Sequence, residues 1–235
     1  MVTLKGKSLL DVGCGTTLHG VGFVTAGARS YTGMDPSLKM DATEIKSKKS
    51  HHFEPIPFTL SQLTRADSRI NYWLGSWEDL RAEGHQFDVA TLHNVTEHVD
   101  DLESLFSSLA QVMSPGGQLV AHHHNFYCWD GHHCAPKTEE LIDLDNQEQR
   151  LVVDWAHLKT VFPKDHYVSR GLNRITLDEL HALLIKYFVI DVWEEKESPL
   201  GRGRGRFHLL EENIPQGMTR RDLAVKNVLT VCTLR

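Results

Sequence analysis

Short apolar runs alternate along the chain with stretches in which apolar residues recur every three or four positions. The runs predict buried strands, and the recurring positions predict helices with one apolar face. The expected strands cover residues 9–12, 30–34, 70–74, 87–93, 118–122, 188–193 and 227–234. The expected helices cover residues 18–28, 59–66, 102–113 and 176–187. Strands that alternate with helices in this way are typical of an α/β fold with a largely parallel sheet.

Capping and turn residues agree with several of these boundaries. Thr59 and Thr176 stand where N-cap residues are expected, and Glu179 completes the capping pattern that Thr176 begins. The segment Pro115-Gly116-Gly117 is expected to end the helix that starts near Leu102.

The first expected strand runs directly into a turn with glycine at positions 13 and 15. Glycine lets the backbone turn tightly and lets a ligand approach it, because no Cβ stands in the way. Such a turn presents backbone N–H groups at the edge of a parallel sheet where α/β domains hold nucleotide-like ligands. Asp35 follows the second expected strand, and a carboxylate at that place can accept both hydroxyls of a ribose.

Three further segments extend this pattern. They are Gly75-Ser76-Trp77-Glu78-Asp79-Leu80 after the third expected strand, the block 87–99 with its strand and Glu97-His98-Val99, and Pro115-Gly116-Gly117 after the next helix. Together with Asp11-x-Gly13-x-Gly15 and Asp35, they cover about half of the chain in a fixed order. In this order the segments resemble the S-adenosylmethionine-dependent methyltransferases of the Rossmann-like class I fold.

The resemblance implies a fold class and a domain organisation. The fold class is α/β, a Rossmann-like three-layer sandwich with a seven-stranded, mostly parallel sheet whose final strand is antiparallel. The whole chain, residues 1–235, is expected to form a single methyltransferase domain. Insertions near residues 39–68 and 125–173 are candidates for a lid and a substrate cap. The first insertion carries a run of lysines and histidines over residues 46–52, for which a solvated surface loop is the simpler interpretation.

The resemblance also implies S-adenosylmethionine as the cofactor. The residues that would border it are Asp11, Gly13, Cys14, Gly15, Asp35, Ser76, Trp77, Glu78, His93 and Asn94. Asp35 would hold the ribose, and Asp11 would orient the amino group through water or through the glycine turn. Trp77 would pack against the adenine, although a place in the hydrophobic core agrees with the sequence equally well.

Histidines gather in the segment 122–134, which follows the fifth expected strand. We expect this segment to lie at the same edge of the sheet as the glycine turn. A histidine there can accept the proton that an alcohol or phenol loses during transfer, and Tyr127 and Trp129 are candidates for the substrate wall. The candidate catalytic residues are His93, His124 and His133, with His123 and His132 as alternatives.

Two other interpretations of the histidine segment stay open. Histidine and cysteine are metal donors, but their spacing fits no standard closed zinc pattern, so the sequence assigns no metal site. Some of the histidines are expected to be structural and hydrogen-bonded to the loop. Because side chains alternate along a strand, His122 and His124 should share a face opposite to His123.

Composition narrows the functional class. The chain has 235 residues and a formal net charge of −6, which argues against non-specific nucleic-acid binding. No apolar run has the length of a membrane span, and the N-terminus has no signal-peptide pattern. The four cysteines are scattered and predict no disulfide framework, so we expect a cytoplasmic protein. A second subunit in a homodimer is one way in which the substrate could be covered.

These features predict a methyltransferase that acts on a small molecule, with oxygen as the favoured acceptor atom. The histidines alone carry the preference for oxygen. The segment Asn94-Val95-Thr96-Glu97 lacks the Pro-Pro-aromatic motif that marks methylation of exocyclic amines, which disfavours methylation of DNA and of amide nitrogens. Two alternatives are a regulatory protein that binds the cofactor without turnover, and an RNA or protein methyltransferase that uses the basic segment 201–206.

Overall fold

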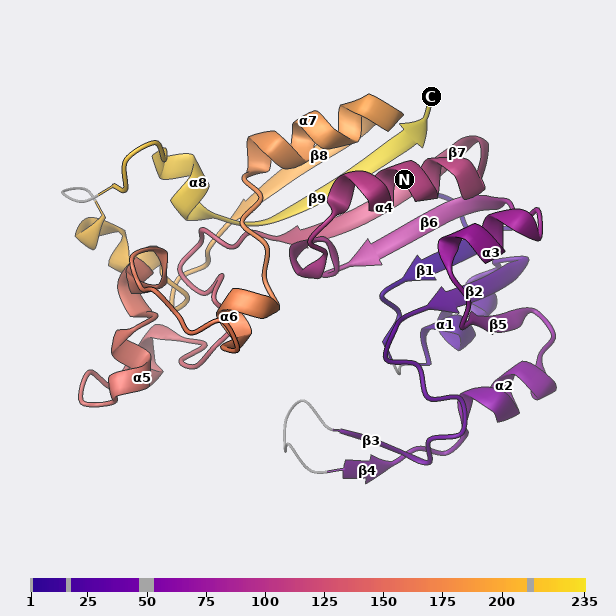
Figure 1. Ribbon diagram of the computed structural model, residues 1–235, viewed down its shortest axis with the longest axis horizontal. Helices are drawn as coiled ribbons and strands as arrows, with labels where there is room; N and C mark the ends of the chain where they lie inside the picture. Colours follow the sequence, from indigo (N-terminus) through magenta and orange to yellow (C-terminus); the bar gives the residue numbers. More distant parts are fainter. Residues whose placement is uncertain (1, 16–17, 47–52, 211–213) are drawn as a thin grey trace. The chain divides into compact units, whose positions relative to one another are not determined.

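The computed structural model describes residues 2–15, 18–46, 53–210 and 214–235 (Figure 1). The chain separates into two compact units. The first unit consists of residues 1–93, 107–120 and 233–235, and the second of residues 94–106 and 121–232. Within the described part of the chain, no helix is both long enough and apolar enough to span a membrane.

Seven strands form one sheet in the order β5-β2-β1-β6-β7-β9-β8 (Figure 1). Their bounds are Ser8–Val12 (β1), Ser30–Met34 (β2), Ile70–Trp73 (β5), Phe87–His93 (β6), Met113–His124 (β7), Phe188–Glu197 (β8) and Val225–Leu234 (β9). The final strand, β9, is antiparallel. These strands confirm the predicted fold class, a Rossmann-like three-layer α/β sandwich. The sequence pattern did not predict β3 (Glu44–Lys46) and β4 (Phe53–Pro55), which pair with each other in a separate antiparallel ladder.

The longer helices follow the predicted pattern with shifted ends. They are α1 (His19–Thr25), α2 (Leu60–Ala66), α4 (Leu102–Val112) and α7 (Leu177–Tyr187). The sequence pattern did not predict α3 (Trp77–Ala82). Thr59 and Thr176 cap α2 and α7, and each cap is completed by the side chain three residues later, Gln62 and Glu179. The predicted caps of these two helices are therefore confirmed.

The expected turn at Pro115-Gly116-Gly117 is wrong in its place, because α4 ends at Val112 and β7 begins at the next residue. Gly117 explains why the strand continues through this segment. A Cβ on Gly117 would lie 2.8 Å from the Ser114 carbonyl oxygen and 3.2 Å from that of Phe87. Only glycine lets the start of β7 approach the start of β6 so closely.

The core of the first unit is built on β1, β2, β5 and β6. Leu9, Tyr31, Ile70 and Val89 come from four neighbouring strands and form one buried cluster with Val24 of α1. Gly20 of α1 faces this cluster, since a Cβ there would lie 2.7 Å from the Tyr31 ring. Close packing of α1 on the sheet therefore depends on glycine at this position.

The second unit contains the remaining short helices. These are η1 (Thr96–His98), η2 (Glu139–Leu141), α5 (Gln147–Arg150), η3 (Val153–Leu158), α6 (Tyr167–Arg170), η4 (Arg204–Leu209) and α8 (Arg220–Ala224). Trp129, Trp155, Phe207 and Leu223 belong to one of its buried hydrophobic clusters. Trp129 is completely buried there, so the expectation that it walls the substrate is wrong.

The proposed lid and cap remain predictions. Residues 47–52, which hold most of the lysine and histidine run, lie outside the described residues. The second insertion, residues 125–173, falls within the second unit and carries η2, α5, η3 and α6.

Candidate functional site

The glycine turn after β1 is joined to Asp35 by a hydrogen bond. The backbone N–H of Gly15 donates to Asp35 Oδ2 at 2.9 Å. Gly13 and Gly15 both have positive φ, 71° and 61°, which L side chains rarely adopt. The other carboxylate oxygen of Asp35 accepts the backbone N–H of Ser37 at 2.7 Å. Asp35 Oδ1 also accepts the Ser37 hydroxyl at 2.5 Å, so three of the roughly four acceptor positions of the carboxylate are used and about one remains for a ribose hydroxyl.

Asp11 lies beneath the same turn and is almost completely buried. Its carboxylate accepts hydrogen bonds from the Tyr31 hydroxyl at 3.0 Å and the Thr91 hydroxyl at 2.8 Å. The His19 ring at the start of α1 approaches it at 3.4 Å. Asp11 therefore ties three neighbouring elements together, and it can influence a ligand through these partners.

Cys14 stands between the two glycines with its side chain buried. Burial, followed by the negative charges of Asp11 and Asp35, raises the pKa of its thiol to about 12. The thiol is therefore protonated at neutral pH. What Cys14 offers a ligand in the turn is its backbone.

The residues after β5 form the first turn of α3. Ser76 is the N-cap, and its hydroxyl accepts the backbone N–H of Asp79 at 3.2 Å while the Asp79 carboxylate bonds back to Ser76. Trp77 is half-buried and Glu78 is exposed. Trp77 is therefore not a fully buried core residue, which leaves part of its ring for contact with a ligand.

These groups share one edge of the first unit. Within the parallel strands, Val12 pairs with Met34 and with Leu92, and Met34 pairs with Trp73. The loops after β1, β2, β5 and β6 therefore all start at the carboxyl ends of adjacent parallel strands. This is the edge at which open α/β sheets bind ligands.

His93 and Asn94 end β6 and are both exposed. Asn94 belongs to the second unit, where its carboxamide oxygen accepts the His122 Nδ1–H at 2.7 Å. Asn94 has φ 53°, a left-handed conformation in which asparagine is tolerated better than most residues. The contact between Asn94 and His122 fixes the orientation of both side chains.

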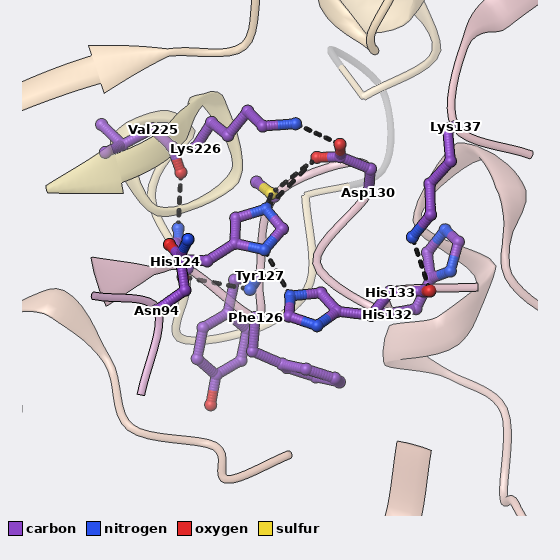
Figure 2. A network of polar contacts seen from close by, with 12 residues as sticks. Asn94, His124, Phe126, Tyr127, Asp130, His132, His133, Lys137, Val225 and Lys226 are labelled. Carbon is purple, nitrogen blue, oxygen red and sulfur yellow. Dashed lines mark hydrogen bonds and ion pairs between the residues drawn. The ribbon is translucent and has the colours of Figure 1, made fainter. Parts of the chain in front are cut away.

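His124 and His133 form a stacked pair in the second unit, with ring centroids 4.5 Å apart (Figure 2). His124 Nδ1 faces His133 Nε2 in a short polar contact. His124 Nε2 lies 3.5 Å from Asp130 Oδ1, and Asp130 is paired with Lys226. Burial lowers the pKa of His133 to about 3, so this ring is neutral at physiological pH.

The alternative catalytic candidates, His123 and His132, are buried and contact groups of the protein itself. His123 is buried on the face opposite to His122 and His124, as the strand alternation predicted, and its Nδ1 lies 2.8 Å from the Thr96 hydroxyl. His132 is fully buried and accepts the Cys134 backbone N–H at 3.0 Å. Burial lowers the pKa of His123 to about 3 and that of His132 to about 2.

Glu97 is a functional candidate that the sequence reasoning missed. It lies in η1, is 1% exposed, and neither carboxylate oxygen has a hydrogen-bond partner among the described residues. Burial raises the pKa of Glu97 to about 7, although the nearby backbone amides and Thr96 favour the charged form. One oxygen lies within 4.8 Å of ring nitrogens of both His124 and His133. The signal was present in the sequence, where Glu97 was used only as part of a family motif.

The turn that carries Glu97 is held by Asn173. The Asn173 carboxamide donates to the carbonyl oxygens of Thr96 at 2.6 Å and Val99 at 2.8 Å, and its backbone N–H donates to the carbonyl of Glu97 at 2.9 Å. These three bonds fix the backbone on both sides of the buried carboxylate. Tyr127, a predicted wall residue, is half-buried and donates its hydroxyl to the Arg174 carbonyl at 2.6 Å.

Comparison with known proteins places this geometry in a family. Residues 2–187 match the family model described as methyltransferase domain. A stretch of 118 residues is 32% identical to a ubiquinone biosynthesis O-methyltransferase of Coxiella burnetii, covering 50% of this chain and 44% of the relative. A similar stretch is 36% identical to the human mitochondrial protein of that name, covering 49% of this chain and 28% of the relative. The matches therefore span less than half the length of these curated relatives.

Solved structures agree at the level of the fold. An S-adenosylmethionine-dependent methyltransferase from Mesorhizobium loti aligns with 99% of this chain and 93% of its own, with a TM-score of 0.56 and 19% identity. A putative S-adenosylmethionine-dependent methyltransferase from Listeria monocytogenes aligns with 100% of this chain and 93% of its own, with a TM-score of 0.57 and 16% identity. The chain belongs to the methyltransferase-domain family and has the Rossmann-like fold of the S-adenosylmethionine-dependent methyltransferases.

Proposed function

We propose that this protein transfers a methyl group from S-adenosylmethionine to a hydroxyl oxygen of a small molecule. The observation that supports the proposal best is the gathering of Gly13, Gly15, Asp35, Trp77 and His93 at the carboxyl ends of adjacent parallel strands. That edge offers backbone N–H groups, a carboxylate and an aromatic ring to a nucleoside. S-adenosylmethionine supplies a methyl group already activated on a sulfonium.

Each cofactor residue has a defined role in this proposal. Gly13, Cys14 and Gly15 let the ligand approach the backbone, and Asp35 accepts the ribose hydroxyls. Ser76, Trp77 and Glu78 border the adenine, with the half-buried Trp77 ring against its face. Asp11 holds the glycine turn from beneath. His93 and Asn94 border the methionine part of the cofactor.

The preference for oxygen rests on two observations. The curated relatives that match are named ubiquinone biosynthesis O-methyltransferases. Histidines also stand at the end of β6 and at and after the end of β7, and a histidine can take the proton that a hydroxyl loses when its oxygen accepts a methyl group. We assign this proton to His93, His124 or His133. The protein's remaining task is to align donor and acceptor and to exclude water.

The alternative of an RNA methyltransferase is disfavoured by the contacts of the basic segment. Arg206 donates through Nε to Asp154 at 2.8 Å. The backbone N–H groups of Gly203 and Gly205 both donate to Glu139. The segment is therefore tied to two acidic side chains of its own unit, as a structural loop would be. A cytoplasmic location and a homodimer stay predictions.

Turnover with a panel of small hydroxylated compounds tests the proposal. The protein is incubated with S-adenosylmethionine and each compound, and both the methylated product and S-adenosylhomocysteine are measured by mass spectrometry. We expect both products in equal amounts with at least one phenol or alcohol. Cofactor binding without turnover on any acceptor class would instead support the regulatory alternative. Strongly salt-dependent RNA binding would support the RNA alternative.

A further inference from the structure

Three potential metal ligands converge in the second unit. One oxygen of Glu97 and one ring nitrogen each of His124 and His133 lie within 4.8 Å of one another. Zinc binds histidine nitrogen and carboxylate oxygen at about 2.0–2.2 Å, which puts two tetrahedral ligands roughly 3.3 Å apart. The upper limit of the observed spacing, 4.8 Å, exceeds this value by about 1.5 Å.

Glu97 is the observation that points to a cation. Its carboxylate is almost completely buried, and no described residue gives either oxygen a hydrogen bond. A buried carboxylate without a partner is costly, and it is neutralised either by taking up a proton or by binding a cation. The three bonds from Asn173 hold the backbone of the turn that carries Glu97.

The histidines are oriented as metal ligands are. His124 Nε2 faces the Asp130 carboxylate at 3.5 Å, which leaves Nδ1 directed at His133 (Figure 2). On the other side, His133 Nδ1 lies 3.5 Å from the Tyr167 hydroxyl, which leaves Nε2 directed at His124. In metal sites, a carboxylate or hydroxyl on the outer nitrogen fixes the ring and its tautomer in this way.

The backbone of His133 is held in a sparsely populated conformation. Its φ is 57°, in the left-handed region, where a side chain other than glycine is disfavoured by about 1 kcal/mol or more. Such outliers persist where the surroundings impose them, often at ligand sites. This conformation places the His133 ring on His124.

A second set of donors, His124, Cys128 and Asp130, lies nearby but is less suited to a metal. Asp130 is already neutralised by the ion pair with Lys226. The Cys128 thiol donates to Asp130 Oδ1 at 3.3 Å, so it is occupied as well. Asp130 and Cys128 instead contact the Nε2 atom of His124.

We propose that Glu97, His124 and His133 bind one divalent metal ion of the zinc class. Two imidazoles and one carboxylate are a ligand set typical of catalytic zinc, and three protein ligands leave a fourth position open. No zinc pattern was recognisable in the sequence, because Glu97 lies 27 residues before His124 and the three ligands come together only in the folded unit.

The metal site does not depend on the methyl-transfer proposal, whereas its role in catalysis does. A histidine nitrogen that binds a metal cannot also accept a proton, so His124 and His133 would not act as free bases in the loaded protein.

Metal binding is tested on the full chain without a histidine tag. Zinc content is measured by mass spectrometry after dialysis, and Co²⁺ is titrated into chelator-treated protein while its visible absorption is recorded. We expect about one equivalent of metal and an intense four-coordinate cobalt spectrum. Glu97→Gln and His133→Gln should each weaken binding by more than about tenfold, because even losing an outer partner of a ligand costs that much.

Matched controls keep the result interpretable. His208→Gln removes an exposed histidine of the same unit and should bind metal as the wild type does. Glu97→Gln preserves the shape of the side chain, and its circular dichroism should match the wild type. The proposal is overturned if the wild type binds no more than a trace, if Glu97→Gln and His133→Gln bind normally, or if Cys128→Ser alone abolishes binding. Neither cofactor nor acceptor is present, so these outcomes leave the methyl-transfer proposal to its own test.

Discussion

Helix α1 contains two glycines, and alanine should have opposite effects at them. A Cβ on Gly20 would lie 2.7 Å and 2.9 Å from two carbons of the Tyr31 ring and 3.0 Å from Ile70 Cγ2. Tyr31 cannot easily move, because it is fully buried and its hydroxyl donates to Asp11 at 3.0 Å. A Cβ on Gly22 would meet nothing within 4 Å.

The expected magnitudes follow from two terms. Alanine favours a helix interior over glycine by about 0.8–1 kcal/mol, and this gain applies at both positions. Gly22→Ala should therefore raise the free energy of unfolding by about 0.5–1 kcal/mol. Gly20→Ala gains the same amount but loses about 1–3 kcal/mol to overpacking, so it should be net destabilising by up to about 2 kcal/mol. The difference between the two variants isolates the steric term.

Urea unfolding followed by circular dichroism measures both values, and thermal unfolding gives a second readout. For a chain of this size, each kcal/mol shifts Tm by about 2–4 °C. The two variants should move Tm in opposite directions. Equal shifts of the same sign would refute the claim that α1 packs against the sheet through Gly20.

Three further predictions concern single side chains. Lys226→Met should cost about 3 kcal/mol near pH 7, because it strips the buried Asp130 carboxylate of its cation. Burial alone would raise the pKa of Asp130, but His124 and Lys226 lower it below the ordinary carboxyl value. The ionised carboxylate therefore stabilises the fold above the ordinary carboxyl pKa, and this stabilisation is lost as pH falls through the lowered pKa. In urea unfolding from pH 3 to 8, the loss of unfolding free energy in Lys226→Met should therefore be largest near pH 8. A loss that does not change with pH would contradict this reasoning. Cys14, with its pKa raised to about 12, should resist thiol reagents at pH 8 until urea is added, whereas the half-buried Cys134 reacts first; immediate labelling of Cys14 would contradict its burial. Trp77→Ala should weaken S-adenosylhomocysteine binding by about two- to tenfold in calorimetry with little change in Tm; the reverse result would make Trp77 a core residue.

The sheet could be predicted from the sequence because buried strands and half-buried helices have characteristic patterns of apolar residues. Strands such as β1 and β6 are enclosed on both faces, so they read as continuous apolar runs. The caps Thr59 and Thr176 were predictable because their hydrogen bonds are local. The start of β7 was misplaced because Gly117 serves a contact with the carbonyls at the start of β6, which lie about thirty residues earlier in the chain.

The cofactor side of the site was easier to predict than the histidine side. The cofactor candidates lie near the ends of predicted strands or within a few residues after them, so strand prediction places them. The grouping of Glu97 with His124 and His133 depends on how η1 and the loop after β7 fold, which no short motif records. Trp129 was misassigned because an aromatic residue in a polar loop gives no local sign of complete burial.

The central claim is that the edge formed by the loops after β1, β2, β5 and β6 binds S-adenosylmethionine through Asp35. Calorimetric titration with S-adenosylhomocysteine tests it most directly, with Asp67→Asn as a control that removes a surface carboxylate of the same unit. Hydrogen bonds to a charged group contribute about 1.5–3 kcal/mol, so Asp35→Asn should weaken binding at least about tenfold while Asp67→Asn binds as the wild type does. No heat with the wild type, or equal affinity for Asp35→Asn, would contradict the claim.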